Sequence, residues 1–219
     1  MILVTGSSGR LGTILLGQME PNQVVGYDIK HGDDILDSDA LAEAMAGCEM
    51  VVHLAAIPGP IEGPDWGDYF GANCLGTFNV AERAAMYSVK RLVFASSLAY
   101  YGYETGIPLR KPVTEESPPI PTYLKAGDLQ CYDQALMYSQ SKMIAENILA
   151  FYGLTKRLEV VCLRFGALGP VTTFEQAAAA IMWALTAPGP FWYEAFNVTR
   201  PEVDWVDCGK ILEAGHDIR

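Results

Sequence analysis

Short apolar runs alternate with amphipathic stretches along almost the whole chain. Strands are predicted where apolar residues cluster, at about 1–5, 23–28, 50–54, 91–96, 158–163 and 193–198. Helices are predicted where apolar residues recur with helical spacing, at about 10–19, 38–47, 67–87, 137–152 and 174–186. Strands that alternate with helices are typical of a doubly wound parallel sheet with helices on both faces. The pattern therefore predicts an α/β fold.

Two regions interrupt this alternation. Residues 98–136 are rich in Gly, Pro and Tyr, and residues 164–173 and the tail after Val198 lack a clear period. Both regions follow the carboxyl ends of predicted strands, the edge at which open α/β sheets bind ligands. We therefore expect them to form the walls of a substrate cleft. The chain divides on this basis into a cofactor-binding domain, residues 1–163, and a short substrate-binding region, residues 164–219, which also completes the fold.

The first predicted strand leads directly into a loop that contains Gly6, Gly9 and Gly12 and opens a helix. Glycines at this spacing allow a tight turn, a close approach of the backbone to a pyrophosphate, and close packing of the helix on the sheet. Asp28 ends the second strand about twenty residues later, where a carboxylate can accept hydrogen bonds from an adenosine ribose. The same carboxylate repels a 2′-phosphate, although Arg10 could offset part of that repulsion. The spacing predicts a Rossmann-type fold that binds NAD, with NADP disfavoured.

A possible general base is found in a later helix. Tyr138 and Lys142 are four residues apart, which places the phenol and the ammonium on one face. A free phenol has a pKa of about 10, and a nearby cation favours the phenolate that a base near neutral pH requires. Ser97 ends the fourth predicted strand, where its hydroxyl could donate to the substrate oxygen on which the tyrosine acts. Together the three residues predict proton transfer at an alcohol or carbonyl.

Composition excludes several other classes of function. The 219 residues carry a net charge of -11 and no long run of Lys or Arg, so the chain offers no basic face to nucleic acid or to an anionic membrane. The five cysteines are scattered singly, without the spacing of a metal site or of disulfides. We expect no metal, and a chain that starts on an apolar strand without a basic leader predicts a cytoplasmic protein.

Taken together, the motifs resemble the extended short-chain dehydrogenase/reductase family, also called the NAD-dependent epimerase/dehydratase family. The matching motifs span about residues 1–166. They are Thr5-Gly6-x-x-Gly9-x-x-Gly12, Asp28, Asp34-Ile35, His53-Leu54-Ala55-Ala56, Asn73-x-x-Gly76-Thr77-x-Asn79, Phe94-Ala95-Ser96-Ser97 with Tyr101-Gly102, Tyr138-x-x-x-Lys142 and Leu163-Arg164.

The resemblance implies a role for each matching residue. Tyr138 is the acid/base, Lys142 lowers the tyrosine pKa and binds the nicotinamide ribose, and Ser97, rather than Ser96, orients the substrate oxygen. The residues expected to bind or line NAD are Gly6, Ser8, Gly9, Arg10, Leu11, Gly12, Asp28, Asp34, Ile35, Leu54, Ala55, Ala56, Asn73, Tyr138 and Lys142. The resemblance also suggests a homodimer built on the helices at 67–87 and 137–152.

The chain departs from the family pattern in two places. The segment after Lys142 is shorter than in typical members and leaves little room for a nucleotide diphosphate, so the closer resemblance is to the uronate dehydrogenases of the same superfamily. Arg164 would then hold a substrate carboxylate, because a guanidinium recognises carboxylates with two parallel hydrogen bonds; an equally weighted alternative is a structural arginine. Residues 123–133 form an apparent insertion, either a lid over the site or a segment without a role.

Three hypotheses about function remain open at this point. The first is an NAD-dependent oxidoreductase that transfers hydride at a secondary alcohol or carbonyl of a sugar or sugar acid. The second is a sugar epimerase or dehydratase that returns the hydride, and the third is a non-catalytic NAD sensor. The presence of Ser97, Tyr138 and Lys142 favours an enzyme, because a sensor has no chemical need for them.

Overall fold

The computed structural model describes residues 1–106, 109, 111–120 and 133–217. Its helices and strands, in chain order, are β1 (Ile2–Thr5), α1 (Arg10–Leu16), η1 (Pro21–Gln23), β2 (Val24–Tyr27), η2 (Ile29–His31), α2 (Ser38–Met45), β3 (Met50–His53), α3 (Trp66–Tyr69), η3 (Phe70–Leu75), α4 (Gly76–Met86), β4 (Arg91–Ser97), η4 (Leu98–Tyr101), η5 (Tyr103–Thr105), α5 (Asp133–Leu154), β5 (Glu159–Phe165), α6 (Phe174–Thr186), β6 (Glu194–Val198) and α7 (Gly209–Glu213).

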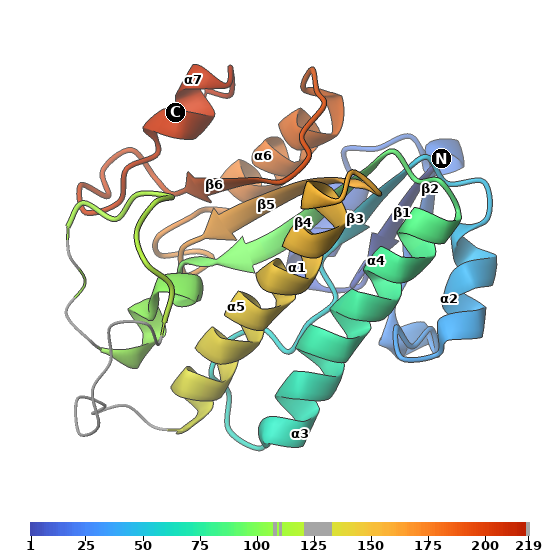
Figure 1. Ribbon diagram of the computed structural model, residues 1–219, viewed down its shortest axis with the longest axis horizontal. Coiled ribbons are helices and arrows are strands. Elements are labelled where there is room, and N and C mark those ends of the chain that lie inside the picture. The colour runs from blue at the N-terminus through green and yellow to red at the C-terminus, as the bar shows by residue number, and fades with distance from the viewer. Residues whose placement is uncertain (107–108, 110, 121–132, 218–219) are drawn as a thin grey trace.

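A single parallel sheet carries the fold. Six strands are ordered β2-β1-β3-β4-β5-β6, and every neighbouring pair is parallel. All the carboxyl ends therefore lie at one edge, where the strand arrows in Figure 1 point. The predicted Rossmann-type α/β fold is confirmed. The strand order reverses between β1 and β3, since β2 is added on one side of β1 and β3 on the other, and such sheets bind ligands in the crevice at this point.

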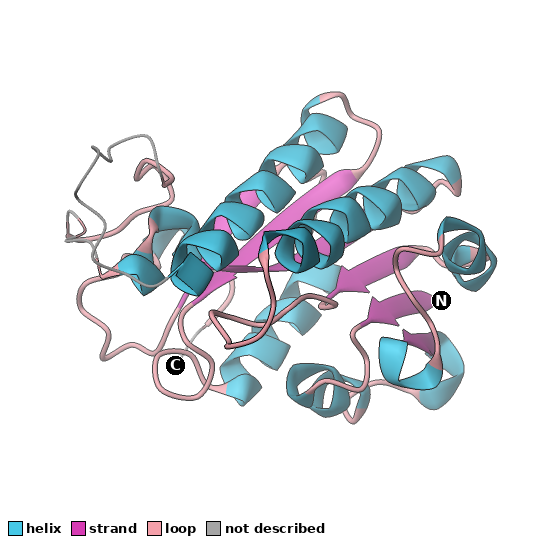
Figure 2. Cartoon of the chain, turned by 90° about the horizontal axis from the view of Figure 1, so that it is seen from below, coloured by secondary structure: helices cyan, strands magenta, loops and turns pink. Residues whose placement is uncertain are grey.

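Helices cover both faces of this sheet, as the two views in Figures 1 and 2 show. Leu3 and Leu92 join the buried core under α2, α4 and α5, whereas their strand neighbours Val4 and Val93 join the core under α1 and α6. Successive strand residues point to opposite faces, so continuous apolar runs are what a sheet covered on both sides requires. Among the described residues, no helix combines the length and the apolar character needed to cross a bilayer.

The predicted elements differ from the observed ones mainly at their ends. Helix α1 ends at Leu16 rather than at residue 19, with Gly17 as its C-cap. The predicted helix at 67–87 is interrupted, since the π-helical turn η3 separates α3 from α4. The short helix α7 was not predicted, because five residues are too few to show a helical period.

The proposed division of the chain falls inside a strand. Residues 163 and 164 both belong to β5, and β6 adds to the edge of the same sheet. The part of the chain after Arg164 thus contributes a strand and a helix, α6, to the core before it reaches the segment from Thr199 to α7. The division into residues 1–163 and 164–219 stays a prediction.

Candidate active site

The glycine loop connects β1 to α1 at the carboxyl edge of the sheet. Gly6 has a φ of +72°, and a Cβ placed there would lie 2.6 Å from the backbone nitrogen of Ala55. A Cβ on Gly12 would lie 2.5 Å from the carbonyl oxygen of Gly6, and Gly9 is the N-cap of α1. The loop is therefore closed tightly on itself and on the chain after β3, which is the compact backbone that a pyrophosphate site needs.

Asp28 follows β2 and faces the same loop. Its Oδ2 accepts a hydrogen bond from the backbone nitrogen of Ser8 at 2.8 Å, and its Oδ1 accepts one from the nitrogen of Lys30 at 2.9 Å. The hydroxyl of Ser8 lies 2.9 Å from Nε2 of His31. A hollow of about 620 Å³ opens beside Ser8 and His31. The predicted carboxylate thus stands next to the predicted loop, with lone pairs left for a ribose diol.

The residues expected beside the adenine and along the cofactor leave β2 and β3 at this edge. Ile35 is buried against Gly76, and Asp34 uses its Oδ1 to accept from the nitrogen of Leu36. The half-buried segment 54–56 begins where the nitrogen of Leu54 donates to the oxygen of Thr5, 3.1 Å away. Their assignment to the cofactor stays a prediction.

Two of the predicted cofactor residues have other contacts. Leu11 is buried in the core between α1 and the sheet. The guanidinium of Arg10 is exposed and lies 4.1 Å from the ring centroid of Phe174, at the start of α6. Neither contact tests the prediction that these residues lie against bound NAD.

The three candidate catalytic residues meet around the carboxyl end of β4. Ser97 is the last residue of β4, and its Oγ accepts from the nitrogen of Ala99 at 3.1 Å. Ala99 in turn belongs to a small buried cluster with Tyr69 and with Tyr138 of α5. Nζ of Lys142 donates to the oxygen of Ala95 at 3.0 Å and lies 5.8 Å from the centroid of the Tyr138 ring. Hydroxyl, phenol and ammonium therefore border one small region.

The surroundings of Lys142 decide how readily it keeps its proton. Burial lowers the pKa of this ammonium from 10.5 to about 8, and the negative charge of Glu146, one turn further along α5, opposes that change. Lys142 is therefore mostly charged at neutral pH. A buried cation close to a phenol favours the phenolate, as the predicted role of Lys142 requires.

Asn73 links the cofactor side of the site to the catalytic helix. It lies in the π-helical turn η3 and is buried. Its Oδ1 accepts from the nitrogen of Ile57 at 2.7 Å, and its Nδ2 donates to Oγ of Ser141 at 2.8 Å. Ser141 immediately precedes Lys142, so Asn73 holds α5 at a fixed position relative to the chain that follows β3.

Arg164 is buried and already well occupied. Its Nε and Nη2 donate to the carboxylate of Glu146, with Nη2–Oε2 at 2.6 Å. Its Nη1 donates to the hydroxyl of Tyr101 at 2.6 Å and to the backbone oxygen of Glu115 at 3.3 Å. Its guanidinium carbon lies 3.7 Å from the centroid of the Tyr100 ring. Recognition of a carboxylate through two parallel hydrogen bonds needs two free N–H groups, which this arrangement does not leave; the substrate role of Arg164 stays a prediction.

The sequence analysis missed two polar residues of the site, Glu146 and Asn197, and named Tyr101 only as part of a family motif. Glu146, Tyr101 and Asn197 are buried and hydrogen-bonded in one network with Arg164. Glu146 had a visible signal, since it continues the four-residue spacing of Tyr138 and Lys142 on the same helix face. Asn197 had none, because no local pattern says which strand ends will meet.

Metal ligands and the insertion complete the comparison with the sequence. Among the described residues there is no group of His, Cys, Asp or Glu arranged to hold a metal ion, and Cys48, Cys74, Cys162 and Cys208 are buried free thiols. Residues 123–132 of the predicted insertion, with Cys131, lie outside the described residues. Asp133, the last residue of that segment, begins α5.

Comparison with known proteins places the chain in a family. Residues 2–187 match the NAD dependent epimerase/dehydratase family. The chain therefore belongs to the NAD-dependent epimerase/dehydratase family, as the motifs predicted.

Some of the relatives are named as sugar-oxidising enzymes. The chain is 30% identical to L-arabinose 1-dehydrogenase (NAD(P)(+)) of Haloferax volcanii over 182 residues, which are 76% of this chain and 66% of that protein. It is 25% identical to uronate dehydrogenase of Pseudomonas syringae pv. tomato over 186 residues, covering 77% of this chain and 60% of that protein. The chain thus spans two thirds or less of the length of these relatives. A solved structure titled "Mutated Uronate Dehydrogenase" shares the fold with a TM-score of 0.78 at 24% identity, covering 98% of this chain and 79% of the other.

Proposed function

We propose that this protein is an NAD-dependent oxidoreductase that transfers hydride at a secondary alcohol or carbonyl of a sugar or sugar acid. One observation carries the proposal: Ser97, Tyr138 and Lys142 meet at the carboxyl end of β4. This strand neighbours β3, and the chain that follows β3 lies against the glycine loop. The names of two relatives, an arabinose dehydrogenase and a uronate dehydrogenase, support this substrate class.

The residues present fit an NAD molecule. The glycine loop leaves no room for side chains between its turns, and Asp28 presents a carboxylate beside it. Bound NAD would supply the hydride acceptor. A 2′-phosphate at Asp28 would place two negative charges together, so we propose that NAD is used in preference to NADP.

The protein's own side chains would move the proton. Ser97 holds the substrate oxygen by a hydrogen bond, and Tyr138 removes the hydroxyl proton as the hydride leaves the carbon. The pKa of a phenol has to fall by about three units for this work near neutral pH, a stabilisation of roughly 4 kcal/mol for the phenolate. Lys142, 5.8 Å from the tyrosine ring and shielded from water, is a cation of the right sign at the right place.

An epimerase or dehydratase is the second candidate, because the matching family includes both. Such an enzyme would use the same three residues but would return the hydride, so no net NADH would appear. Product analysis separates the two candidates.

The decisive experiment measures NADH formation from NAD with a panel of aldoses, uronic acids and nucleotide sugars, with products identified by NMR. An oxidoreductase produces NADH and an oxidised sugar, whereas an epimerase produces a sugar isomer without NADH. Tyr138→Phe is the control, because it keeps the ring and removes only the acid/base hydroxyl. If no substrate turns over faster with the wild type than with Tyr138→Phe, the catalytic proposal is wrong and the sensor hypothesis gains.

We also propose that the protein is a homodimer that pairs through α4 and α5, which lie side by side in Figure 1. Both helices expose large apolar side chains: Phe78 is 43% exposed, Phe151 55% and Leu154 72%. A second copy would remove these surfaces from water. Light scattering on a size-exclusion column should give twice the chain mass for the wild type and a single chain mass for Phe151→Glu; a monomeric wild type would contradict the proposal.

A cytoplasmic location is proposed on the state of the thiols. Cys48, Cys74, Cys162 and Cys208 are free and buried, and thiols persist in reducing compartments. Cell fractionation with an antibody against the native protein tests this, and recovery in an oxidising compartment would contradict it.

A further inference from the structure

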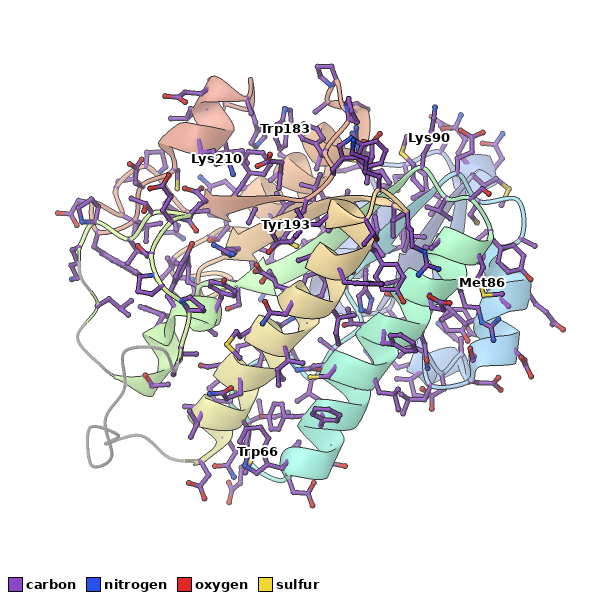
Figure 3. The ribbon with its side chains drawn as sticks, in the orientation of Figure 1. Trp66, Met86, Lys90, Trp183, Tyr193 and Lys210 are labelled. Carbon is purple, nitrogen blue, oxygen red and sulfur yellow. The ribbon has the colours of Figure 1, made fainter. Side chains whose placement is uncertain are left out.

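One buried carboxylate joins the catalytic helix to neighbouring strands. Glu146 is fully buried in α5, one turn after Lys142. It accepts hydrogen bonds from the hydroxyl of Ser96 in β4, from Arg164 in β5 and from the hydroxyl of Tyr193 just before β6, the last at 3.0 Å. Tyr193 is labelled in Figure 3, beside the sheet and α5. The proposed reaction uses none of these contacts directly, yet all of them fix α5 on the sheet.

Arg164 extends this network beyond the helix. The Tyr101 hydroxyl, which accepts from Nη1 of Arg164, donates to Oδ1 of Asn197 at 2.9 Å. The backbone nitrogen of Asn197 then donates to the carboxylate of Glu115 at 2.7 Å. A continuous buried path therefore runs from α5, through β5 and η4, to β6 and to residue 115.

The far end of this path holds two segments at the carboxyl edge, residues 111–115 and 205–208, which we call the outer segments. Nδ2 of Asn197 donates to the carbonyl oxygens of Val113 and Asp207, at 3.4 and 3.2 Å. The outer segments also pair with each other, since the nitrogen of Val113 donates to the oxygen of Trp205 at 2.9 Å. They follow η5 and β6, at the edge where substrates of such sheets bind.

A network of this kind adds little to the free energy of unfolding compared with apolar packing of the same volume. A buried ion pair loses much of its Coulomb attraction to desolvation, and well-packed apolar residues often stabilise a protein as much. What the planar guanidinium and the carboxylate add is direction, because each hydrogen bond fixes an angle as well as a distance. The charge on Arg164 is secure: burial opposes it, but the contacts with Glu146 raise the pKa of the guanidinium overall. The guanidinium therefore keeps its charge at any working pH.

We propose that Glu146 and Arg164 are positioning residues, which act through Tyr101 and Asn197 to hold the outer segments, as a wall of the substrate cleft, at a fixed place relative to Tyr138 and Lys142. The proposal rests on the proposed function, since it assumes a substrate between these parts. It assigns Arg164 a task other than binding a substrate carboxylate. Misplacement of a substrate by about 1 Å can cost on the order of a hundredfold in rate, so the wall matters to catalysis without touching the reacting atoms.

The sharpest test removes one hydroxyl from the path. Tyr101→Phe keeps the ring but breaks the link between Arg164 and Asn197. Tyr152→Phe is the matched control, because Tyr152 is equally buried and donates to the carboxylate of Glu82 at 2.7 Å, at the other end of α5. We expect Tyr101→Phe to lower kcat/KM for the sugar at least tenfold, with the Kd for NAD within twofold of wild type, and Tyr152→Phe to leave both within twofold. Equal effects of the two variants would overturn the proposal.

A second variant distinguishes positioning from substrate binding. Arg164→Lys keeps the charge but loses the planar fork, and Arg91→Lys is its counterpart in the buried pair with Glu159. Positioning predicts a similar loss of kcat/KM for neutral aldoses and for uronic acids, with the pH profile unchanged in shape. A loss confined to uronic acids would instead show that Arg164 binds the substrate carboxylate, and would overturn the proposal.

Hydrogen exchange keeps the test independent of turnover. If the wild type converts no sugar, the proposed function fails, yet the mechanical link can still be measured by mass spectrometry on the free protein. Tyr101→Phe should then speed amide exchange in the outer segments by at least fivefold, while Tyr152→Phe should not. Unchanged exchange in the outer segments of Tyr101→Phe would show that the network does not hold them.

Discussion

Strands β4 and β5 have an arginine–glutamate pair at each of their two ends, and the two pairs are used differently. At the amino ends, Arg91 of β4 meets its register partner Glu159 of β5, with Nη2–Oε2 at 2.7 Å. The remaining contacts of Arg91 are the carbonyl oxygens of Ala184 and Ala187 and the ring of Phe191. This pair closes the end of α6 and anchors it to the sheet.

At the carboxyl ends, Arg164 of β5 reaches Glu146 on the catalytic helix, and its remaining contacts are Tyr100, Tyr101 and the backbone of Glu115. The same two side-chain types thus tie a helix to the sheet at one end and, in our proposal, the candidate catalytic residues to a cleft wall at the other. What an ion pair does follows from the partners of its spare N–H groups. The comparison teaches that a buried Arg–Glu pair cannot be assigned a task from its burial and distance alone.

The largest expected effect belongs to the catalytic cation at the carboxyl end. Lys142→Met should lower kcat by about 10²- to 10⁴-fold, because Tyr138 then lacks the cation that favours its phenolate and the contribution of a proton-transfer group, which is of this size, is lost. The variant should also be more stable at pH 7, by about 3 kcal/mol. The reason is that the pKa of Lys142 falls from 10.5 in the unfolded chain to about 8 on folding, so the buried charge costs the folded state its full amount below about pH 8 and less as pH rises.

Steady-state NADH assays and urea unfolding measure the two effects. Lys90, just before the amino end of β4, is exposed and labelled in Figure 3, and Lys90→Met should change neither quantity. A Lys142→Met variant that is inactive and also less stable would indicate that the lysine serves the fold first.

The next effect compares the two ion pairs directly. Removing one partner of a buried pair leaves a charge without compensation and commonly costs about 3–5 kcal/mol. Glu146→Gln should lie in that range because the carboxylate side chain is 0% exposed, whereas Glu159→Gln should cost less because Glu159 is 19% exposed. Urea unfolding gives both values. At a temperature where both variants are folded, only Glu146→Gln should lower kcat/KM, and equal losses of activity would erase the distinction between the ends.

The sequence predicted the parts of the molecule that repeat a local rule. The alternation of apolar runs and helices located all six strands of the sheet, because a strand buried on both faces must be apolar throughout. The spacing of Tyr138 and Lys142 placed both on one face of α5, with Nζ of Lys142 5.8 Å from the centroid of the Tyr138 ring. These are short-range patterns that any single segment displays.

The rest depends on contacts between segments far apart in the chain. Arg164 admitted two interpretations because its partners, Tyr101 and Glu146, are 63 and 18 positions away and belong to other elements. The π-helical turn that holds Asn73 has no composition signal, since it is one extra residue in an otherwise helical pattern. Tertiary geometry decides both features.

A smaller effect concerns acid stability at the carboxyl end. His53 ends β3 with both ring nitrogens in hydrogen bonds, to Thr5 at 2.7 Å and Thr77 at 3.0 Å. Burial, followed by the charge of Lys142, lowers the pKa of His53 from 6.5 to about 3. Between these values the unfolded chain binds a proton that the folded protein does not, so stability falls as the pH drops below 6.5, by about 2 kcal/mol at pH 5.

Urea unfolding at a series of pH values checks this. His53→Gln should lower stability at pH 7 but remove the part of the acid dependence that His53 causes. An unaltered slope in His53→Gln would mean that other groups carry the acid sensitivity.

The smallest effect tests whether position at the carboxyl edge is enough to influence catalysis. Helix α6 runs between the two ends, from the Thr173 cap at the carboxyl edge to the carbonyls that Arg91 binds. The side-chain oxygen of Thr173 accepts a hydrogen bond from the backbone nitrogen of Gln176 at 3.0 Å, and Oε1 of Gln176 accepts one from the backbone nitrogen of Thr173 at 3.1 Å. Thr173→Ala should cost about 1 kcal/mol of unfolding free energy, the usual loss for such a cap. Because Thr173 makes no contact with the network of Glu146 and Arg164 among the described residues, kcat/KM should stay within twofold. A larger loss would show that the loop between β5 and α6 forms part of the substrate cleft, as the sequence predicted for residues 164–173, and that the absence of a contact with the network does not separate structural from catalytic positions.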